Sequence, residues 1–150
     1  MIGLLQRVTE AWVSLDGRRV AAIDRGLLVL LGVEAGDNTG TGSRLLHKML
    51  NYRIFPDAAG RMNVGLAAVG GGLLLVPQFT LVADTRKGLR PSFGAAAAPA
   101  QGRALFEALV AAARAQHPSV EAGVFGANMQ VGLVNDGPVT FWLQVQSETD

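Results

Sequence analysis

Leu27-Leu28-Val29-Leu30-Leu31-Gly32-Val33 is a short run that contains no charged or strongly polar side chain. A strand with one face in water alternates apolar and polar residues, whereas an unbroken apolar run of this length is typical of a strand covered on both faces. Arg25-Gly26 interrupts the chain directly before the run. We therefore predict a strand at the centre of a sheet.

The segment before this run is predicted to form an antiparallel hairpin. From Ile2 to Leu15 apolar and polar residues partly alternate, and Asp16-Gly17 is a typical two-residue turn before a second strand from Arg18 to Ile23. Farther along the chain, another buried strand is expected from Leu73 to Val76, after Gly70-Gly71-Gly72.

Two helices are predicted after the central strand. Gly36 to Gly42 is polar and rich in glycine, and either Thr41 or Ser43 is expected to cap a helix that continues to about Tyr52. The apolar spacing from Pro99 to Ala115 indicates a second amphipathic helix with its proline in the first turn, where a missing N–H costs little.

The chain is expected to finish with two strands, from about Val124 to Val134 and from Val139 to Val145, joined by a turn at Asn135-Asp136-Gly137-Pro138. Strands and helices mixed in this order predict an α/β layered fold with the helices against one face of the sheet system. A single domain is expected over residues 1–150.

Composition limits the classes of function. The chain of 150 residues is 49% hydrophobic, which is enough for one core, and no apolar run approaches the roughly 18 residues of a membrane span. The first residues lack the pattern of a secretion signal, so a cytoplasmic protein without membrane association is expected. The absence of cysteine excludes disulfides and thiolate chemistry, and the distant His47 and His117 do not form a metal pair. No metal and no cofactor is predicted.

A net charge of +1 does not by itself indicate a polyanionic partner. Arg86, Lys87 and Arg90 nevertheless form a local cluster of cations within residues 83–91. Such a cluster is typical either of a solvated loop or of a site that contacts phosphates.

Two segments depart from the ordinary pattern of strands. Val76-Pro77-Gln78-Phe79-Thr80-Leu81 places a proline, which cannot donate a ladder hydrogen bond, at the end of a buried strand. The chain is expected to leave the sheet there and to turn the N–H of Gln78 or Phe79 toward a ligand, with the hydroxyl of Thr80 beside it. The alternative is a plain strand end with a packed Phe79.

The second segment is Asn135-Asp136-Gly137-Pro138-Val139-Thr140, where a Gly-Pro bond in a tight connection is one of the few places in which a cis peptide is tolerated. Such a corner presents carbonyl oxygens outward, although a simple hairpin turn also fits these residues. A conventional nucleophile is not evident, because Thr80, Ser92 and Thr140 each lack a positioned base.

The residues of this chain resemble bacterial D-aminoacyl-tRNA deacylases over nearly its whole length. The stretches that carry the resemblance are Leu5–Val8, Gly26–Val33, Tyr52–Phe55, Met62-Asn63, Gln78–Leu81, Ala83–Thr85, Gly88, Arg90–Phe93, Met129–Val131 and Asn135–Thr140. The resemblance implies a β/β/α layered fold and a homodimer that hydrolyses the ester of D-aminoacyl-tRNA and of mischarged glycyl-tRNA.

The same resemblance implies roles for individual residues. A cis Gly137-Pro138 turn from the partner subunit is expected to enter the pocket and to reject L-amino acids, with Met129 and Pro77 also at the substrate. The Phe79 N–H is implied as the oxyanion donor, while Gln78 and Thr80 position the ester. The terminal ribose 2′-OH of the tRNA is expected to assist the attack of water. Arg86, Lys87 and Arg90 are expected to contact tRNA phosphates.

Three positions depart from the family pattern, and they leave alternatives open. Pro77 stands where serine is usual, and related deacylases that act on mischarged L-alanine also have proline there, so relaxed chirality is one alternative. Asn128 replaces a common aspartate and Gly102 a common alanine. Two further alternatives for the function remain open. One is a noncatalytic dimer that binds tRNA 3′ ends or free D-amino acids, and the other is a hydrolase that uses Thr80 as nucleophile.

Overall fold

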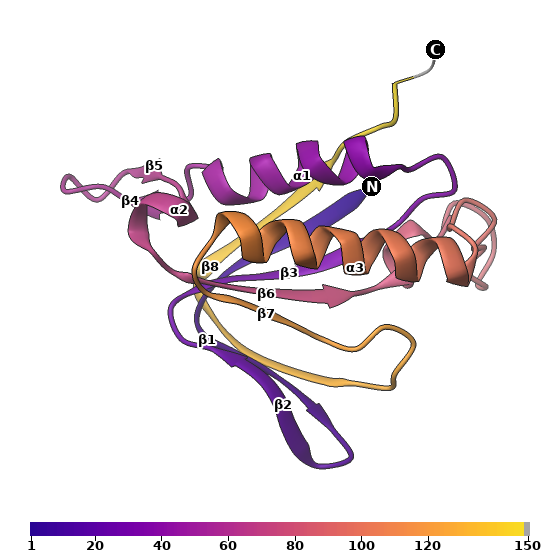
Figure 1. Ribbon diagram of the computed structural model, residues 1–150, viewed down its shortest axis with the longest axis horizontal. Coiled ribbons are helices and arrows are strands. Elements are labelled where there is room, and N and C mark those ends of the chain that lie inside the picture. The colour runs from indigo at the N-terminus through magenta and orange to yellow at the C-terminus, as the bar shows by residue number, and fades with distance from the viewer. Residues whose placement is uncertain (149–150) are drawn as a thin grey trace.

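The computed structural model describes residues 1–148, in which one six-stranded sheet is covered by helices (Figure 1). The strands of the main sheet follow the order β2-β1-β3-β6-β7, and β8 pairs with β1 outside this path. Within residues 1–148, no helix is long and apolar enough to cross a membrane. The strands of the main sheet are β1 (Ile2–Leu15), β2 (Arg18–Ile23), β3 (Gly26–Gly32), β6 (Gly72–Pro77), β7 (Val120–Ala122) and β8 (Gln130–Gln144). The other elements are α1 (Thr39–Asn51), the hairpin of β4 (Phe55–Pro56) and β5 (Met62–Val64), α2 (Leu66–Val69), the 3₁₀ helix η1 (Phe79–Val82) and α3 (Pro99–Gln116).

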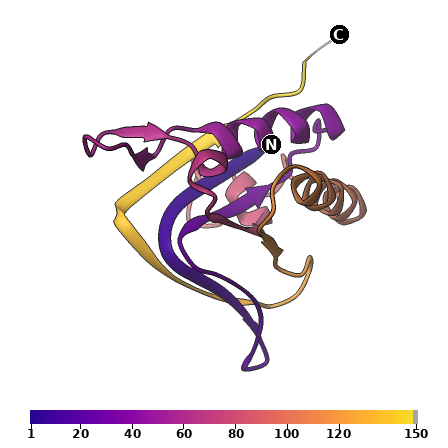
Figure 2. The same cartoon turned by 60° about the vertical axis from the view of Figure 1, so that its left-hand side comes forward.

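The long strand β1 divides the sheet into two parts. On one edge its first half, Ile2–Val8, pairs with β3, and its second half, Ala11–Leu15, pairs with β2. On the other edge β8 follows β1 along both halves. Figure 2 shows β1 and β8 curving together, so that the β1–β2 hairpin lies away from the two helices. The predicted hairpin at Asp16-Gly17 is confirmed, with both residues at positive φ.

Two hydrophobic cores follow from this curvature, and strands β3 and β6 contribute to both. Side chains of Leu27, Val29, Leu73 and Leu75 pack toward the helices, whereas those of Leu28, Leu74 and Val76 pack against the β1–β2 hairpin. Successive side chains of a strand point to opposite faces, so an unbroken apolar run fills both layers. The predicted central strand and the β/β/α layered fold are therefore confirmed, with β1–β2, the central sheet and the helices as the layers.

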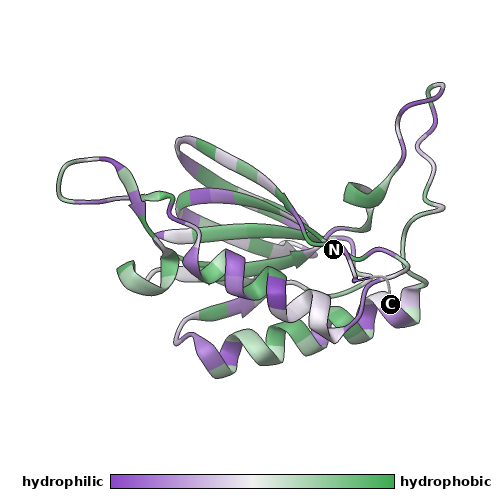
Figure 3. Cartoon of the chain, turned by 90° about the horizontal axis from the view of Figure 1, so that it is seen from above, coloured by the Kyte–Doolittle hydropathy of each residue, from purple (hydrophilic) through white to green (hydrophobic). Residues whose placement is uncertain are grey.

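The two long helices are amphipathic, and hydrophilic and hydrophobic residues alternate along their ribbons in Figure 3. The cap predicted for α1 is wrong, because neither Thr41 nor Ser43 occupies that place. Asn38 is the N-cap, and its Oδ1 accepts from the Thr41 N–H at 3.0 Å, while Thr41 completes a capping box. Helix α3 begins at Pro99 as predicted and continues to Gln116.

The prediction of two final strands joined by a turn is also wrong. Residues 130–144 form the single strand β8, and residues 124–129 lie in the loop before it. Gln6 pairs with Thr140 and Val8 with Asn135, so that only Arg7 faces residues 136–139. The Gly137-Pro138 segment is therefore a bulge within one strand, and the residues on both sides of it pair with β1.

Candidate active site

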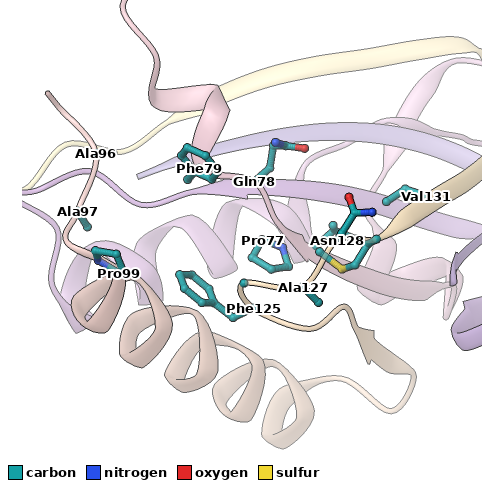
Figure 4. A pocket seen from close by; sticks show the side chains of 13 residues that line it. Pro77, Gln78, Phe79, Ala96, Ala97, Pro99, Phe125, Ala127, Asn128 and Val131 are labelled. Carbon is teal, nitrogen blue, oxygen red and sulfur yellow. The ribbon is translucent and has the colours of Figure 1, made fainter. Parts of the chain in front are cut away.

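A pocket of about 510 Å³ lies where strand β6 ends and the chain enters η1 (Figure 4). Three segments far apart in the sequence form its walls. Its lining residues are Val76, Pro77, Gln78, Phe79, Ala96, Ala97, Pro99, Phe125, Gly126, Ala127, Asn128, Met129 and Val131. The sequence-predicted residues Pro77, Gln78, Phe79 and Met129 are thus brought together.

The backbone N–H of Phe79, just after the end of β6, is unpaired at this pocket. Pro77 is the last residue of β6 and pairs with Leu31. The Gln78 N–H donates to the Leu31 carbonyl at 2.8 Å, which extends the pairing by one residue. Phe79 begins η1, and its N–H has no acceptor among residues 1–148. Of the two N–H groups considered from the sequence, the one at Phe79 is therefore available to a ligand.

The side chains around this N–H are arranged by short-range contacts. The Gln78 amide donates a hydrogen bond to the Thr80 hydroxyl. Thr80 is exposed and is not among the residues that line the pocket. Phe79 is 59% exposed, and its ring contacts Phe93 with the centroids 5.0 Å apart. Phe93 is also 39% exposed, so the two rings form an exposed apolar patch, and such patches mark sites that bind a ligand or partner.

Sequence reasoning missed two walls of the pocket. Ala96 and Ala97 lie beside the residues that follow β3, because Glu34 forms a bridge with Ala96 and the Ala97 N–H donates to the Val33 carbonyl at 3.0 Å. The short side chains of this alanine run leave space that larger ones would fill. Phe125 forms another wall, and the glycines on either side of it, at 123 and 126, were the only sequence signal for a loop there.

The cation cluster lies in the exposed loop that follows η1. Arg86 donates to both carboxylate oxygens of Asp84, at 2.9 and 2.6 Å. Hydrogen bonds from the Arg86 side chain hold the pKa of Asp84 well below its usual range, and the same contact raises the pKa of Arg86. Lys87 and Arg90 are exposed, without an ion pair among the described residues. None of the three cations lines the pocket.

The Gly137-Pro138 peptide bond is cis, as the resemblance implied. Gly137 has φ +151°, and a Cβ added there would lie 2.6 Å from Val139 Cγ2, so a larger residue does not fit. Asn135 Oδ1 accepts from the Val139 N–H at 2.7 Å, and Arg7 Nε donates to the Asp136 carbonyl at 2.9 Å. The turn is exposed, and within residues 1–148 it does not line the pocket of its own chain.

The sequence model of the D-Tyr-tRNA(Tyr) deacylase family matches residues 4–144. The chain belongs to this family. It is 63% identical to the D-aminoacyl-tRNA deacylase of Ectopseudomonas mendocina over 95% of its length and 98% of that protein. The corresponding enzyme of Azotobacter vinelandii is 62% identical over 96% of this chain and 99% of its own. The deacylase family predicted from the sequence is therefore confirmed.

Two solved structures have the same fold as this chain. The c-Myc DNA unwinding element binding protein superposes with a TM-score of 0.93 at 34% identity, over 98% of this chain and 100% of that one. A probable eukaryotic D-amino acid tRNA deacylase has a TM-score of 0.85 at 17% identity, over 96% and 98% of the two chains. The latter likeness concerns the fold alone.

Proposed function

We propose that this chain hydrolyses the ester bond that joins a D-amino acid, or mischarged glycine, to the 3′ end of tRNA. The observation that supports this most strongly is the unpaired Phe79 N–H at the mouth of a pocket of about 510 Å³, in a chain about 60% identical to named deacylases. Gln78 and Thr80 lie next to that N–H. Pro77 and Met129 form the walls against which the amino acid lies.

The chemistry needs no side-chain nucleophile. Water adds to the ester carbonyl carbon, and the Phe79 N–H stabilises the negative charge that develops on the carbonyl oxygen. The bond to the ribose oxygen then breaks, and that oxygen leaves with a proton as the tRNA 3′-hydroxyl. The neighbouring ribose 2′-OH assists the attack of water, while the Gln78 amide, linked to Thr80, positions the ester.

Selectivity is proposed to come from a second copy of the chain. In a homodimer, the cis Gly137-Pro138 turn of one subunit enters the pocket of the other and occupies the volume that the side chain of an L-amino acid requires. The turn suits this role because Asn135 and Arg7 hold both of its ends and Gly137 cannot be enlarged without displacing Val139. The turn can exclude the side chain of an L-amino acid by a steric clash only if the turn itself is rigid.

Contacts with the body of the tRNA are proposed for the loop after η1. Lys87 and Arg90 are free to meet phosphates. Arg86 contributes less, since its guanidinium is already bound by Asp84.

Hydrolysis of D-tyrosyl-tRNA, glycyl-tRNA and L-tyrosyl-tRNA by the purified chain tests the activity directly. We expect rapid hydrolysis of D-tyrosyl-tRNA and glycyl-tRNA, whereas L-tyrosyl-tRNA is expected to keep its amino acid. Hydrolysis of all three aminoacyl-tRNAs at the uncatalysed rate would support a noncatalytic tRNA-binding dimer instead. Hydrolysis of L-tyrosyl-tRNA at a rate similar to that of D-tyrosyl-tRNA would show that Pro77 relaxes the chirality.

The dimer is tested by sedimentation equilibrium. A species of twice the 15.7 kDa chain mass is expected. A monomer at the concentrations used in the activity assay would rule out a pocket completed by a partner.

A further inference from the structure

A second hollow, a groove of about 460 Å³, lies between helix α3 and residues 122–125. Phe125 lines both this groove and the catalytic pocket, so the two spaces share a wall. Figure 4 shows the Phe125 ring between α3 and Pro77. A molecule that extends out of the pocket past this ring therefore enters the groove.

The charged side chains of the groove come from one face of α3. Arg103, Glu107 and Arg114 all line it, and they follow one another at spacings of four and seven residues. These spacings place side chains on the same face of a helix. Arg103 and Arg114 are about three helical turns apart, roughly 16 Å along the axis. That length is enough for the two arginines to contact different phosphates of one nucleic-acid strand.

The two arginines differ in their surroundings. Arg103 lies over the Phe125 ring, with its guanidinium carbon 5.2 Å from the ring centroid, and its Nη1 is 3.8 Å from Glu107 Oε1. Arg114 is exposed and has no ion pair among residues 1–148. Guanidinium groups bind phosphates with two parallel hydrogen bonds, whereas a carboxylate such as Glu107 repels them. Two cations outweigh one anion along this face.

We propose that this groove binds the phosphate backbone of the single-stranded 3′ end of the tRNA, just before the nucleotide that carries the amino acid. The proposal rests on the deacylase function proposed above. Once the terminal nucleotide occupies the pocket, the strand has to leave through an open side. The side beyond Phe125 has positive charge next to the pocket, because Arg103 lies over the Phe125 ring. On the side of Phe79, the Phe93 ring lies 5.0 Å away, and the cations Lys87 and Arg90 do not line the pocket and are left to contact the body of the tRNA.

The experiment compares two substrates that differ only in the part that would occupy the groove. D-Tyrosyl-tRNA has the full 3′ strand, whereas the D-tyrosyl ester of adenosine has only the terminal nucleoside. Arg114→Glu reverses the unpaired charge, and Glu107→Gln removes the repulsive one. Arg61→Glu, in the exposed turn between β4 and β5 and outside the groove, is the matched control.

Arg114→Glu is expected to lower kcat/KM for D-tyrosyl-tRNA roughly three- to ten-fold at about 0.1 M salt, with a shallower salt dependence, because a phosphate contact is lost. The adenosine ester is expected to be hydrolysed as by the unaltered chain. Glu107→Gln is expected to raise kcat/KM for the tRNA substrate. An effect of Arg114→Glu no larger than that of Arg61→Glu, or an equal fall for both substrates, would overturn the proposal.

Binding of uncharged tRNA by fluorescence anisotropy, with the same variants, separates this proposal from the deacylase function. Weaker binding by Arg114→Glu and tighter binding by Glu107→Gln would support the groove even if the unaltered chain hydrolysed neither substrate. Unchanged binding by both variants would refute it whatever the catalytic result.

Discussion

Replacing Gly102 with alanine is expected to move Phe125, and the structure provides a matched control in Gly42. Both glycines are buried in long helices. A Cβ at Gly42 would meet Leu109 Cδ1 and Met1 Cε at 3.7 Å, which is ordinary contact. A Cβ at Gly102 would lie 3.2 Å from Phe125 Cζ, so the ring has to shift by a few tenths of an ångström.

The magnitudes follow from these contacts. Alanine in place of glycine stabilises a helix interior by about 1 kcal/mol, which raises the melting temperature by roughly 2–4 °C in a chain of this size. Gly42→Ala is expected to show that full gain without a change in kinetics. Gly102→Ala is expected to show a smaller gain, since part of it is offset by the contact with Phe125.

The ring displaced from α3 moves toward Pro77, into the catalytic pocket. Misplacement of a substrate by 1 Å can cost about a hundred-fold in rate, so a few tenths of an ångström corresponds to roughly two- to five-fold in kcat/KM for D-tyrosyl-tRNA. Differential scanning calorimetry and initial rates on both variants measure the two effects. Equal stabilisation by the two substitutions, with unchanged rates, would refute this account of Phe125.

Three further predictions concern the turn, the loop and the hydroxyl at the site. Asn135→Ala leaves the buried Val139 N–H and carbonyl without their partners, and urea unfolding is expected to show a loss of about 1–3 kcal/mol; an unchanged midpoint would show that the amide does not hold the turn. The Asp84 carboxyl is expected to titrate by ¹³C NMR below the ordinary ~3.9 of aspartate and to return toward it in Arg86→Gln. Because its pKa is lowered on folding, the small contribution of this exposed pair to stability is present above about pH 4 and is lost as the pH falls through the lowered pKa. A midpoint of the Asp84 NMR titration that is unaffected by Arg86→Gln would contradict the pairing. Thr80→Ala is expected to retain most of the activity, and a fall of more than about a hundred-fold would instead favour Thr80 as nucleophile.

The elements that the sequence predicts well are those whose signals are local. The apolar run at 27–33 requires burial on both faces, and the strand β3 receives it from the helices on one side and from the β1–β2 hairpin on the other. Asp16-Gly17 likewise adopts the positive φ angles that a tight hairpin needs. In both cases the residues that decide the structure are neighbours in the sequence.

The Asn135–Pro138 segment shows where local signals mislead. Its composition is typical of a turn between strands, yet the pairing with β1 resumes on both sides of it with a shifted register, and a single strand results. Pairing with a strand more than a hundred residues away outweighs the local preference. For a similar reason, the sequence did not decide whether the N–H of Gln78 or that of Phe79 is unpaired. The carbonyl that accepts from the Gln78 N–H belongs to Leu31 on another strand.

The walls of the pocket could be predicted least. Phe125 and Ala97 join the site only because the loop before β8 and the segment before α3 both lie against the end of β6. No spacing between these residues indicates that proximity. Apart from Met129, the residues predicted at the substrate came from the segments 76–81 and 135–140, and the structure places Gly137 away from the pocket of its own chain.

The proposal that each pocket is completed by the partner's turn is tested most directly with mixed dimers. Phe79→Pro removes the N–H donor at the first position of η1, where proline is tolerated, and gives a subunit with an inactive pocket and an intact turn. Gly137→Ala gives the reverse, an intact pocket and a displaced turn. Alone, Gly137→Ala is expected to hydrolyse L-tyrosyl-tRNA at a raised rate relative to D-tyrosyl-tRNA. After subunit exchange with an excess of Phe79→Pro subunits, nearly every active pocket faces an intact turn. The ratio of the L-tyrosyl-tRNA rate to the D-tyrosyl-tRNA rate is then expected to return to that of the unaltered chain. A ratio that stays at the level of Gly137→Ala alone would contradict the account.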